Sequence, residues 1–327
     1  MRRTATPTLI TALLLSTILF PNLASPTNAE PPQKPDTPSR PPIYNPNADA
    51  KTDIAAALSK AKRDNQRVLI MFGANWCGWC HKLHDLFKND RKIARILLYE
   101  YQLVLVDTAR RSKNMDLVAR YGIDLKRSGV PILTVLDADG KVLINQETGP
   151  LESGSKHEPK KVTQFLARWR ATPLDAERVF AEARAAASKQ GKRLFVHLGA
   201  PWCTWCHKLE DFLVRKDMAA ILDQDYINVK IDVDRMRNGK ALARRIRAGE
   251  GSIPWFAILD AGGEKLATSE GPDGNIGFPM KPKEFAHFQK MLRETRNRIT
   301  NQQLARLDTE LRKYADSQRP PEPPKTP

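Results

Sequence analysis

Apolar positions along this chain follow two alternating patterns, and the whole series of patterns occurs twice. Unbroken apolar runs predict buried strands, and apolar residues spaced three and four apart predict helices. The runs predicted as strands are 67–73, 102–107, 193–199 and 226–234. The stretches with helical spacing are 48–65, 114–122, 158–170, 174–191, 236–247 and 281–292. Two further runs, each predicted as a strand, a turn and a second strand, are 128–143 and 251–269. Strands that alternate with helices predict an α/β fold, with helices on both faces of a mixed sheet.

The two halves keep a nearly constant offset. Cys77 and Cys203 are 126 positions apart, and Pro131 and Pro254 are 123 positions apart. A constant offset between equivalent residues indicates a tandem duplication. A chain of 327 residues has room for two ordinary domains, one for each copy.

Both ends of the chain depart from these patterns. Two arginines and an apolar run (8–20) precede small residues that end at Ala29, which is typical of an export signal cleaved near that alanine. The run is shorter than the ~20 residues that a membrane-spanning helix needs, and we find no later segment that could cross a membrane. Residues 30–48 and 317–327 are rich in proline and polar side chains, so we expect extended segments that pack no core.

Composition adds little to this organisation. The formal net charge of +16 would favour anionic partners, but we favour a solvated lysine and arginine surface as its explanation, and no nucleic-acid-binding motif is present. The predicted segments are an export signal at 1–29, a proline-rich linker at 30–48, a first domain at 49–172, a second domain at 173–300, and a helix end with a proline-rich tail at 301–327.

All four cysteines lie in two similar strings, WCGWCHKL and WCTWCHKL. No cysteine remains outside these strings to form a structural disulfide, so we interpret the four as reactive groups. We expect Cys77 and Cys203 where a strand leads into a helix, because backbone N–H groups there favour the thiolate that attacks a disulfide. Cys80 and Cys206 follow one turn later, near enough to displace the resulting mixed disulfide.

Longer matching strings surround the cysteines. They are GANWCGWCHKL with a later GVP in the first half, and GAPWCTWCHKL with a later SIP in the second. Through these residues each half, over 50–172 and 174–295, resembles the thioredoxin superfamily, and the tandem is similar to a short protein disulfide isomerase. The resemblance implies two tandem thioredoxin-like folds and thiol–disulfide exchange. It also implies that Pro131 and Pro254 follow cis peptide bonds and present the preceding backbone to an extended substrate.

Tryptophans flank both cysteine pairs. We expect Trp76 and Trp202 to shield and frame the cysteines. Trp79 and Trp205, which lie between the two cysteines of each pair, would add an apolar lip for unfolded substrate. The dipeptides Gly-Trp and Thr-Trp differ from those of thioredoxins and disulfide isomerases, so the direction of exchange does not carry over from the resemblance.

Histidines provide the remaining candidate groups. His81 and His207 follow the second cysteine of each pair, where a protonated imidazole would favour thiolates; the alternative is that they are partly exposed helix residues. Thioredoxin-like proteins often carry a buried acid six residues before the first cysteine, and this chain has Met71 and His197 there. Met71 cannot move a proton, whereas a histidine with a near-neutral pKa can. The sites are therefore predicted to differ, unless His197 is simply satisfied in the core.

The predicted function is an exported thiol–disulfide oxidoreductase that reduces or isomerises, or else forms, disulfides in envelope or secreted proteins of the periplasm or extracytoplasmic space. Its expected partners are cysteine-containing exported proteins and an unidentified exchange partner, with no cofactor, metal or nucleic acid.

Two alternatives stay open. CGWCH and CTWCH also fit covalent haem attachment, with His81 and His207 as iron ligands, although the strand before each motif and the amphipathic helix after it favour the dithiol. The other alternative is a non-enzymatic thioredoxin-like module that binds copper or a client protein.

Overall fold

The computed structural model describes residues 40–319, and residues 42–319 belong to one compact unit. The predicted export signal at 1–29 lies outside the described residues, as do residues 30–39 of the predicted linker and the end of the predicted tail. No helix in the described part of the chain is long and apolar enough to cross a membrane.

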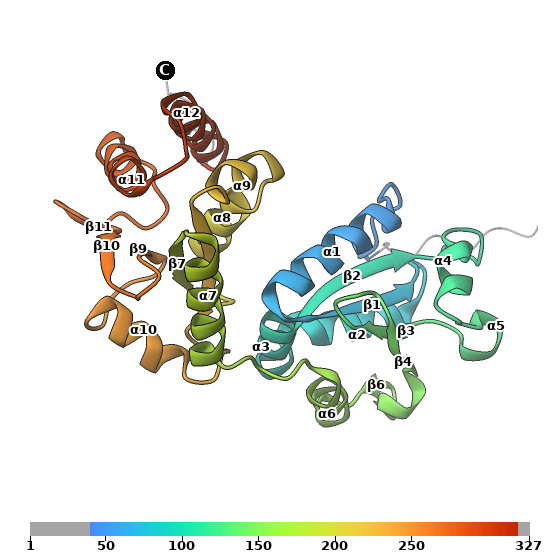
Figure 1. The fold of residues 1–327 in the computed structure, drawn as a ribbon. Helices are drawn as coiled ribbons and strands as arrows, with labels where there is room; N and C mark the ends of the chain where they lie inside the picture. The colour runs from blue at the N-terminus through green and yellow to red at the C-terminus, as the bar shows by residue number, and fades with distance from the viewer. Residues whose placement is uncertain (1–39, 320–327) are drawn as a thin grey trace, which may run out of the picture. The chain divides into compact units, whose positions relative to one another are not determined.

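A mixed four-stranded sheet is the centre of the first half (Figure 1). Its strands are β1 (Arg67–Gly73), β2 (Tyr101–Asp107), β3 (Ile132–Leu136) and β4 (Val142–Glu147). Its helices are α1 (Ala50–Asp64), α2 (Gly78–Asn89), α3 (Arg91–Glu100), α4 (Met115–Arg120), α5 (Leu125–Ser128) and α6 (Pro159–Trp169). The strand order is β2-β1-β3-β4, with β1 parallel to β2 and the other neighbours antiparallel.

Helices cover both faces of this sheet, because successive strand residues point to opposite sides. Val68 and Ile70 of β1 pack on one face with α1 and α4. Leu69 and Met71 pack on the other face with α2, α3 and α6. The near-continuous apolar run of β1 is therefore explained by burial on both faces.

The second half repeats this architecture. Its strands are β7 (Arg193–Gly199), β8 (Tyr226–Asp232), β9 (Trp255–Leu259) and β10 (Lys265–Thr268). Its helices are α7 (Ala176–Gln190), α8 (Thr204–Leu213), α9 (Lys216–Leu222), α10 (Gly239–Arg247), α11 (Pro282–Thr295) and α12 (Asn301–Ser317). The strand order is β8-β7-β9-β10, which corresponds strand by strand to β2-β1-β3-β4 of the first half. The strand directions also match, with β7 parallel to β8 and the other neighbours antiparallel. The predicted α/β fold with two tandem mixed sheets is confirmed.

Short elements complete the two halves. They are the 3-10 turn η1 (Gly149–Leu151) and the paired strands β5 (Glu152–Ser153) with β6 (Lys156–His157) and β11 (Glu270–Gly271) with β12 (Gly274–Asn275).

The prediction that residues 30–48 pack no core is wrong for the end of that segment. Tyr44 is 1% exposed and belongs to the first core. The segment just before α1 is held in place because the Asn75 side chain hydrogen-bonds both the backbone N–H and the backbone carbonyl of Tyr44. Proline richness predicted an extended chain correctly, but one aromatic side chain was enough to anchor it.

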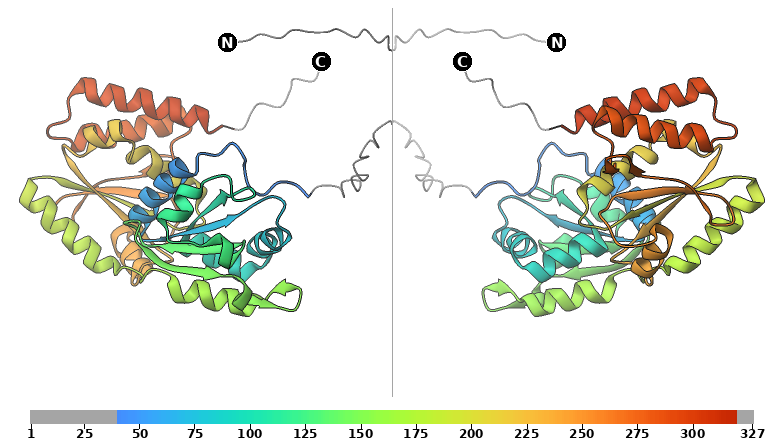
Figure 2. Two further views of the ribbon diagram at one scale, coloured as in Figure 1. Left: turned by 90° about the vertical axis from the view of Figure 1, so that its right-hand side faces the viewer. Right: turned by 90° about the vertical axis from the view of Figure 1, so that its left-hand side faces the viewer.

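Helix α12 is an additional element of the second core. Residues 301–327 were predicted only as a helix end and tail, whereas α12 is a separate helix that lies beside α11 in both views of Figure 2. Leu304, Leu307 and Leu311 are buried against the second core. Thr300 and Gln303 form a capping box that starts the helix.

Asp225 fastens the turn that leads into α12. Its carboxylate accepts hydrogen bonds from the backbone N–H groups of Asn297, Arg298 and Ile299 at 2.8–3.0 Å. We expect Asp225→Ala to lower the free energy of unfolding by about 2–4 kcal/mol, because three backbone N–H groups, of which that of Ile299 is buried, lose a charge-assisted partner. Urea titration measures this, with the exposed Asp316→Ala as a control near zero; equal effects of the two variants would contradict it.

Candidate functional site

Each cysteine pair lies at the start of a helix that directly follows a central strand. Cys77 caps α2 after β1, and its Sγ accepts a hydrogen bond from the Cys80 backbone N–H at 3.1 Å. Cys203 caps α8 after β7 in the same way, again at 3.1 Å from the N–H of Cys206. Both pairs form disulfides, with Cα atoms 5.2 Å apart. A sulfur at this position faces the partial positive charge of the helix end, which favours its thiolate once the disulfide opens.

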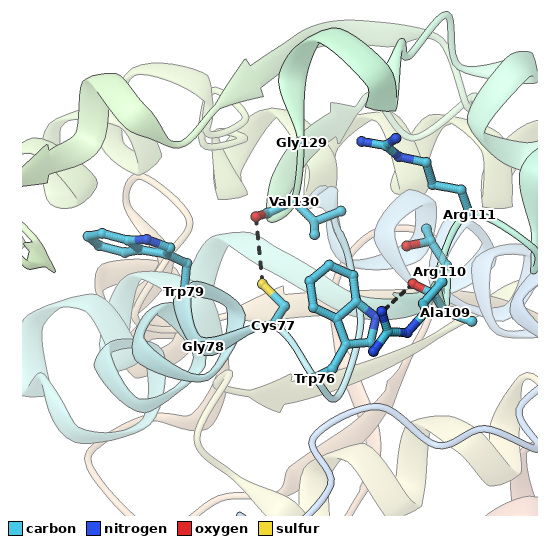
Figure 3. Close-up of a pocket in the computed structure, with 10 residues that line it drawn as sticks. Trp76, Cys77, Gly78, Trp79, Ala109, Arg110, Arg111, Gly129 and Val130 are labelled. Carbon is cyan, nitrogen blue, oxygen red and sulfur yellow. Dashed lines mark hydrogen bonds between the residues drawn. The ribbon is translucent and has the colours of Figure 1, made fainter. Parts of the chain in front are cut away.

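Next to each pair lies the residue that precedes a cis-proline, Val130 beside Cys77 and Ile253 beside Cys203 and Cys206. The Val130–Pro131 and Ile253–Pro254 peptide bonds are both cis, as the resemblance implies. The carbonyl oxygen of Val130 lies 3.6 Å from Cys77 Sγ (Figure 3). This backbone carbonyl is therefore placed where an extended peptide with a sulfur at Cys77 would pair with it.

A pocket of about 390 Å³ opens beside Cys77 (Figure 3). Trp76 and Trp79 line it together with the exposed Arg110. Trp76 is 57% exposed, but its indole N–H donates to the Ala109 carbonyl at 3.0 Å, and Arg110 stacks over its ring. The indole is thus fixed at the rim, as a frame for substrate.

The residues around the second cysteine pair differ from those around the first. Trp202 is 55% exposed, and its indole N–H donates to the Asp234 carboxylate at 2.7 Å rather than to backbone. The same Asp234 oxygen accepts from the Tyr99 hydroxyl of the first half at 3.1 Å. The neighbouring Arg235 is buried in an ion pair with Glu100 at 2.9 Å. Contacts from the first half therefore reach the rim of the second site.

The inner tryptophans also differ. Trp79 meets His157 edge-on, whereas Trp205 stacks on Phe278. Phe278 in turn contacts Tyr314 of α12, which links the C-terminal helix to the second site.

The two motif histidines are held by backbone. Nε2 of His81 lies 2.8 Å from the Asn75 carbonyl oxygen, and Nε2 of His207 lies 2.8 Å from that of Pro201. Nδ1 of His207 also lies 3.7 Å from the Glu210 carboxylate, and this contact with the carboxylate raises the pKa of His207 despite partial burial. His81 is buried, so the alternative of a partly exposed helix residue does not fit it.

His197 does not have the near-neutral pKa on which its predicted role depended. Complete burial lowers its pKa to about 4, against a smaller opposing effect of Glu210. The ring is therefore neutral at physiological pH. Met71 is likewise buried in the first core. The predicted difference between the sites requires other groups.

Glu210 is such a group, and the sequence reasoning missed it. Burial would raise its pKa, but the contact with His207 and the charge of Lys230 hold that pKa at about 2. Lys230 Nζ lies 2.8 Å from Glu210 and 2.9 Å from Asp64 of the first half. The sequence signal was a glutamate among apolar helix positions where the first half has His84.

Glu210 also lies near the second cysteine of its pair. A Cβ placed on Gly199 would be 3.3 Å from Glu210 Oε1 and 3.5 Å from Cys206 Sγ. The carboxylate and the sulfur thus border the same small space. A charged side-chain oxygen next to a thiol raises the pKa of that thiol.

Comparison with known proteins agrees with this geometry. A family model described as thioredoxin-like matches the chain twice, at 49–138 and 175–261, which together make up more than half of its residues. The chain belongs to the thioredoxin-like family. Each thioredoxin-like match contains one cysteine pair and the cis-proline that faces it.

Individual relatives cover parts of the chain. It is 32% identical over 98 residues to the disulfide bond reductase DsbH of Chlamydia pneumoniae, covering 27% of this chain and 57% of that protein. It is 23% identical over 232 residues to the protein disulfide-isomerase tigA of Aspergillus niger, covering 66% of this chain and 58% of that protein. The matches thus span under two thirds of these relatives' lengths. The solved structure of a disulphide isomerase from Xylella fastidiosa Temecula1 shares 31% identity over 38% of this chain and 95% of its own, with a TM-score of 0.36.

Covalent haem uses both sulfurs of a motif as thioethers, whereas here the two sulfurs of each thioredoxin-like site are joined to each other. Within residues 40–319, no group of three or more His, Cys, Asp or Glu side chains is arranged to hold a metal ion.

Proposed function

We propose that this protein is a thiol–disulfide oxidoreductase that reduces or isomerises disulfides in exported proteins. The observation that carries the proposal is that each cysteine pair is a disulfide whose first sulfur caps a helix and packs beside the residue that precedes a cis-proline. The names of the relatives DsbH, a disulfide bond reductase, and tigA, a disulfide-isomerase, support this class of reaction.

The proposed reaction begins with the reduced pair. The Cys77 or Cys203 thiolate attacks one sulfur of a substrate disulfide, forming a mixed disulfide and releasing the other substrate sulfur as a thiolate. Cys80 or Cys206 then attacks the first cysteine, which re-forms the internal disulfide and releases the second substrate sulfur. The substrate gains two electrons and two protons, and the pair loses them. No bound cofactor takes part, but an external thiol must reduce the pair again.

The cis-proline and the tryptophans orient the substrate. The Val130 carbonyl offers one hydrogen bond to an extended chain beside Cys77, and the Trp76 and Trp79 rings border the groove (Figure 3). The leader pattern at 1–29 supports export to the periplasm or another extracytoplasmic space, where such substrates occur.

A redox titration of the full chain tests the proposal. The protein is equilibrated in graded thiol–disulfide buffers, free thiols are alkylated, and the two motif peptides are separated by mass, since Gly78 and Thr204 make them different. We expect both pairs to titrate reversibly, with midpoints between the ~−270 mV of thioredoxin and the ~−180 mV of protein disulfide isomerase. Covalent haem mass, or a bound metal without reversible oxidation, would contradict the proposal.

A further inference from the structure

Tyr44 is held next to the first cysteine pair by the residue that precedes Trp76. The Asn75 side-chain oxygen accepts from the backbone N–H groups of Ile43 and Tyr44, and its amide donates to the Tyr44 carbonyl, all at 2.9 Å. Three hydrogen bonds to one side chain fix the position of the tyrosine. The motif loop and the segment before α1 are therefore built as one unit.

The Tyr44 hydroxyl lies beside the resolving sulfur. A Cβ placed on Gly73 would collide with this hydroxyl and would lie 2.6 Å from Cys80 Sγ. The hydroxyl and the sulfur therefore border the same space, which stays open only because Gly73 has no side chain. Among the described residues the hydroxyl has no hydrogen-bond partner, although it is buried.

A buried hydroxyl without a partner costs free energy, and a phenylalanine would fill the same space without that cost. The unmet donor is found in the disulfide form, in which Cys80 sulfur is a weak acceptor. Reduction changes this, because a thiolate is ionised and accepts a much stronger hydrogen bond. The hydroxyl is thus unsatisfied in one redox state and has an acceptor next to it in the other.

We propose that Tyr44 is a catalytic residue of the first site, whose hydroxyl donates a hydrogen bond to the Cys80 thiolate. Cys80 gives its proton to water or buffer base, and Tyr44 keeps its own. The thiolate then attacks Cys77 of the mixed disulfide; the Cys80–Cys77 bond forms, the Cys77–substrate bond breaks, and the substrate sulfur leaves as a thiolate. The inference rests on the proposed exchange at this pair.

The charges around the hydroxyl are consistent with a donor role. Burial, reinforced by the Asp107 carboxylate at the end of β2, raises the pKa of Tyr44 above its usual range. The phenol therefore stays protonated wherever thiols titrate. The other titratable groups near this unit are His81 of α2, bonded to the Asn75 carbonyl, and Lys113, bonded to the Pro46 carbonyl.

The second half fills the equivalent space with a different oxygen. Glu210 Oε1 and Cys206 Sγ both lie within 3.5 Å of a Cβ built on Gly199. The carboxylate of Glu210 is already paired with Lys230, whereas the phenol is free. One site therefore has a neutral donor and the other an ionised acceptor next to the resolving cysteine.

The test is Tyr44→Phe in the full chain, with Tyr101→Phe as the matched control. Tyr101 is a buried phenol of the same core, but its hydroxyl donates to the Leu166 carbonyl at 2.7 Å. The reduced chain is mixed with oxidised glutathione over a pH series and quenched with acid. Glutathione adducts on each motif peptide are then counted by mass. The second pair is an internal reference in every sample.

We expect Tyr44→Phe to raise the pH midpoint for release of glutathione from Cys77 by about 0.5–1 unit and to slow that release about 3–10-fold at pH 7. The equilibrium constant for reduction of the first pair falls by the same factor, and a tenfold fall lowers its reduction potential by ~30 mV. The second pair does not change. The oxidised variant is as stable to urea as the wild type or more so, whereas Tyr101→Phe is less stable and keeps the wild-type pH profile.

An unchanged profile for the first pair, or equal shifts in both pairs, would overturn the inference. So would a loss of stability in oxidised Tyr44→Phe equal to that of Tyr101→Phe, because the hydroxyl would then have a partner in the disulfide form. Failure of the proposed function itself would be seen separately, as absence of exchange in the wild type.

Discussion

Replacing Cys80 or Cys206 with alanine is expected to trap a mixed disulfide on the remaining cysteine of that pair and to stop turnover there. The resolving sulfur starts one helical turn away, and well-oriented intramolecular attack has an effective molarity of roughly 10⁵ M or more. An external thiol at millimolar concentration cannot replace it. We therefore expect release of substrate to slow by at least about a thousandfold, measured as adducts on each motif peptide.

The matched controls are Cys77→Ala and Cys203→Ala, which remove the attacking sulfur and should form no adduct at the altered pair. The untouched pair in each variant reports whether the two sites work independently. Normal turnover at the first pair in Cys80→Ala, or trapping on the second cysteine in Cys77→Ala, would reverse the roles assigned here.

Replacing Lys230 with methionine is expected to lower the free energy of unfolding by about 3–5 kcal/mol at pH 7. Among the lysines and arginines of residues 40–319, only Lys230 lies within salt-bridge distance of the Glu210 carboxylate, and it also binds Asp64. All three side chains are largely buried. Removing the ammonium group leaves two carboxylates inside the protein with too little compensation.

The loss should depend on pH in a defined direction. The pKa of Glu210 is about 2 in the folded protein and near 4.5 when unfolded, so the wild type gains stability from it above pH 4.5 and loses this gain as pH falls toward 2. Without Lys230, burial favours the protonated acid. The deficit of Lys230→Met is therefore largest at neutral pH and shrinks below about pH 4.5.

Urea titration at a series of pH values measures this effect. The control is Lys62→Met, because Lys62 forms an exposed ion pair with Asp139, and such pairs contribute about 0–1 kcal/mol. A pH-independent deficit for Lys230→Met would mean that lost packing, and not the buried charges, causes the destabilisation.

The sequence predicted the fold well because its signals are local and occur twice. The apolar runs 67–73 and 193–199 coincide with β1 and β7, and the cysteine motifs lie at the predicted strand-to-helix junctions. Burial of both faces of a strand leaves a pattern that is visible in a few consecutive residues. The core elements were therefore accessible without tertiary information.

The groups next to the sulfurs were not predictable in this way. Tyr44 is 29 residues before Gly73 and lies in a proline-rich segment. The charge of Glu210 is stabilised by Lys230, which belongs to strand β8. His197 shows the opposite error: its residue type suggested a proton carrier, but burial lowers its pKa to about 4. Proximity and dielectric environment decide these roles, and neither is encoded in spacing along the chain.

The connection between the two halves explains how a few ionic contacts can hold them together. Only residues 170–175 separate the end of α6 at Trp169 from the start of α7 at Ala176. A tether this short keeps each half near the other at an effective concentration on the order of millimolar. Contacts such as Arg235 with Glu100 therefore close within one molecule and need not support a bimolecular affinity. Cleavage of the tether would turn the same contacts into a weak, dilution-sensitive association between two folded domains.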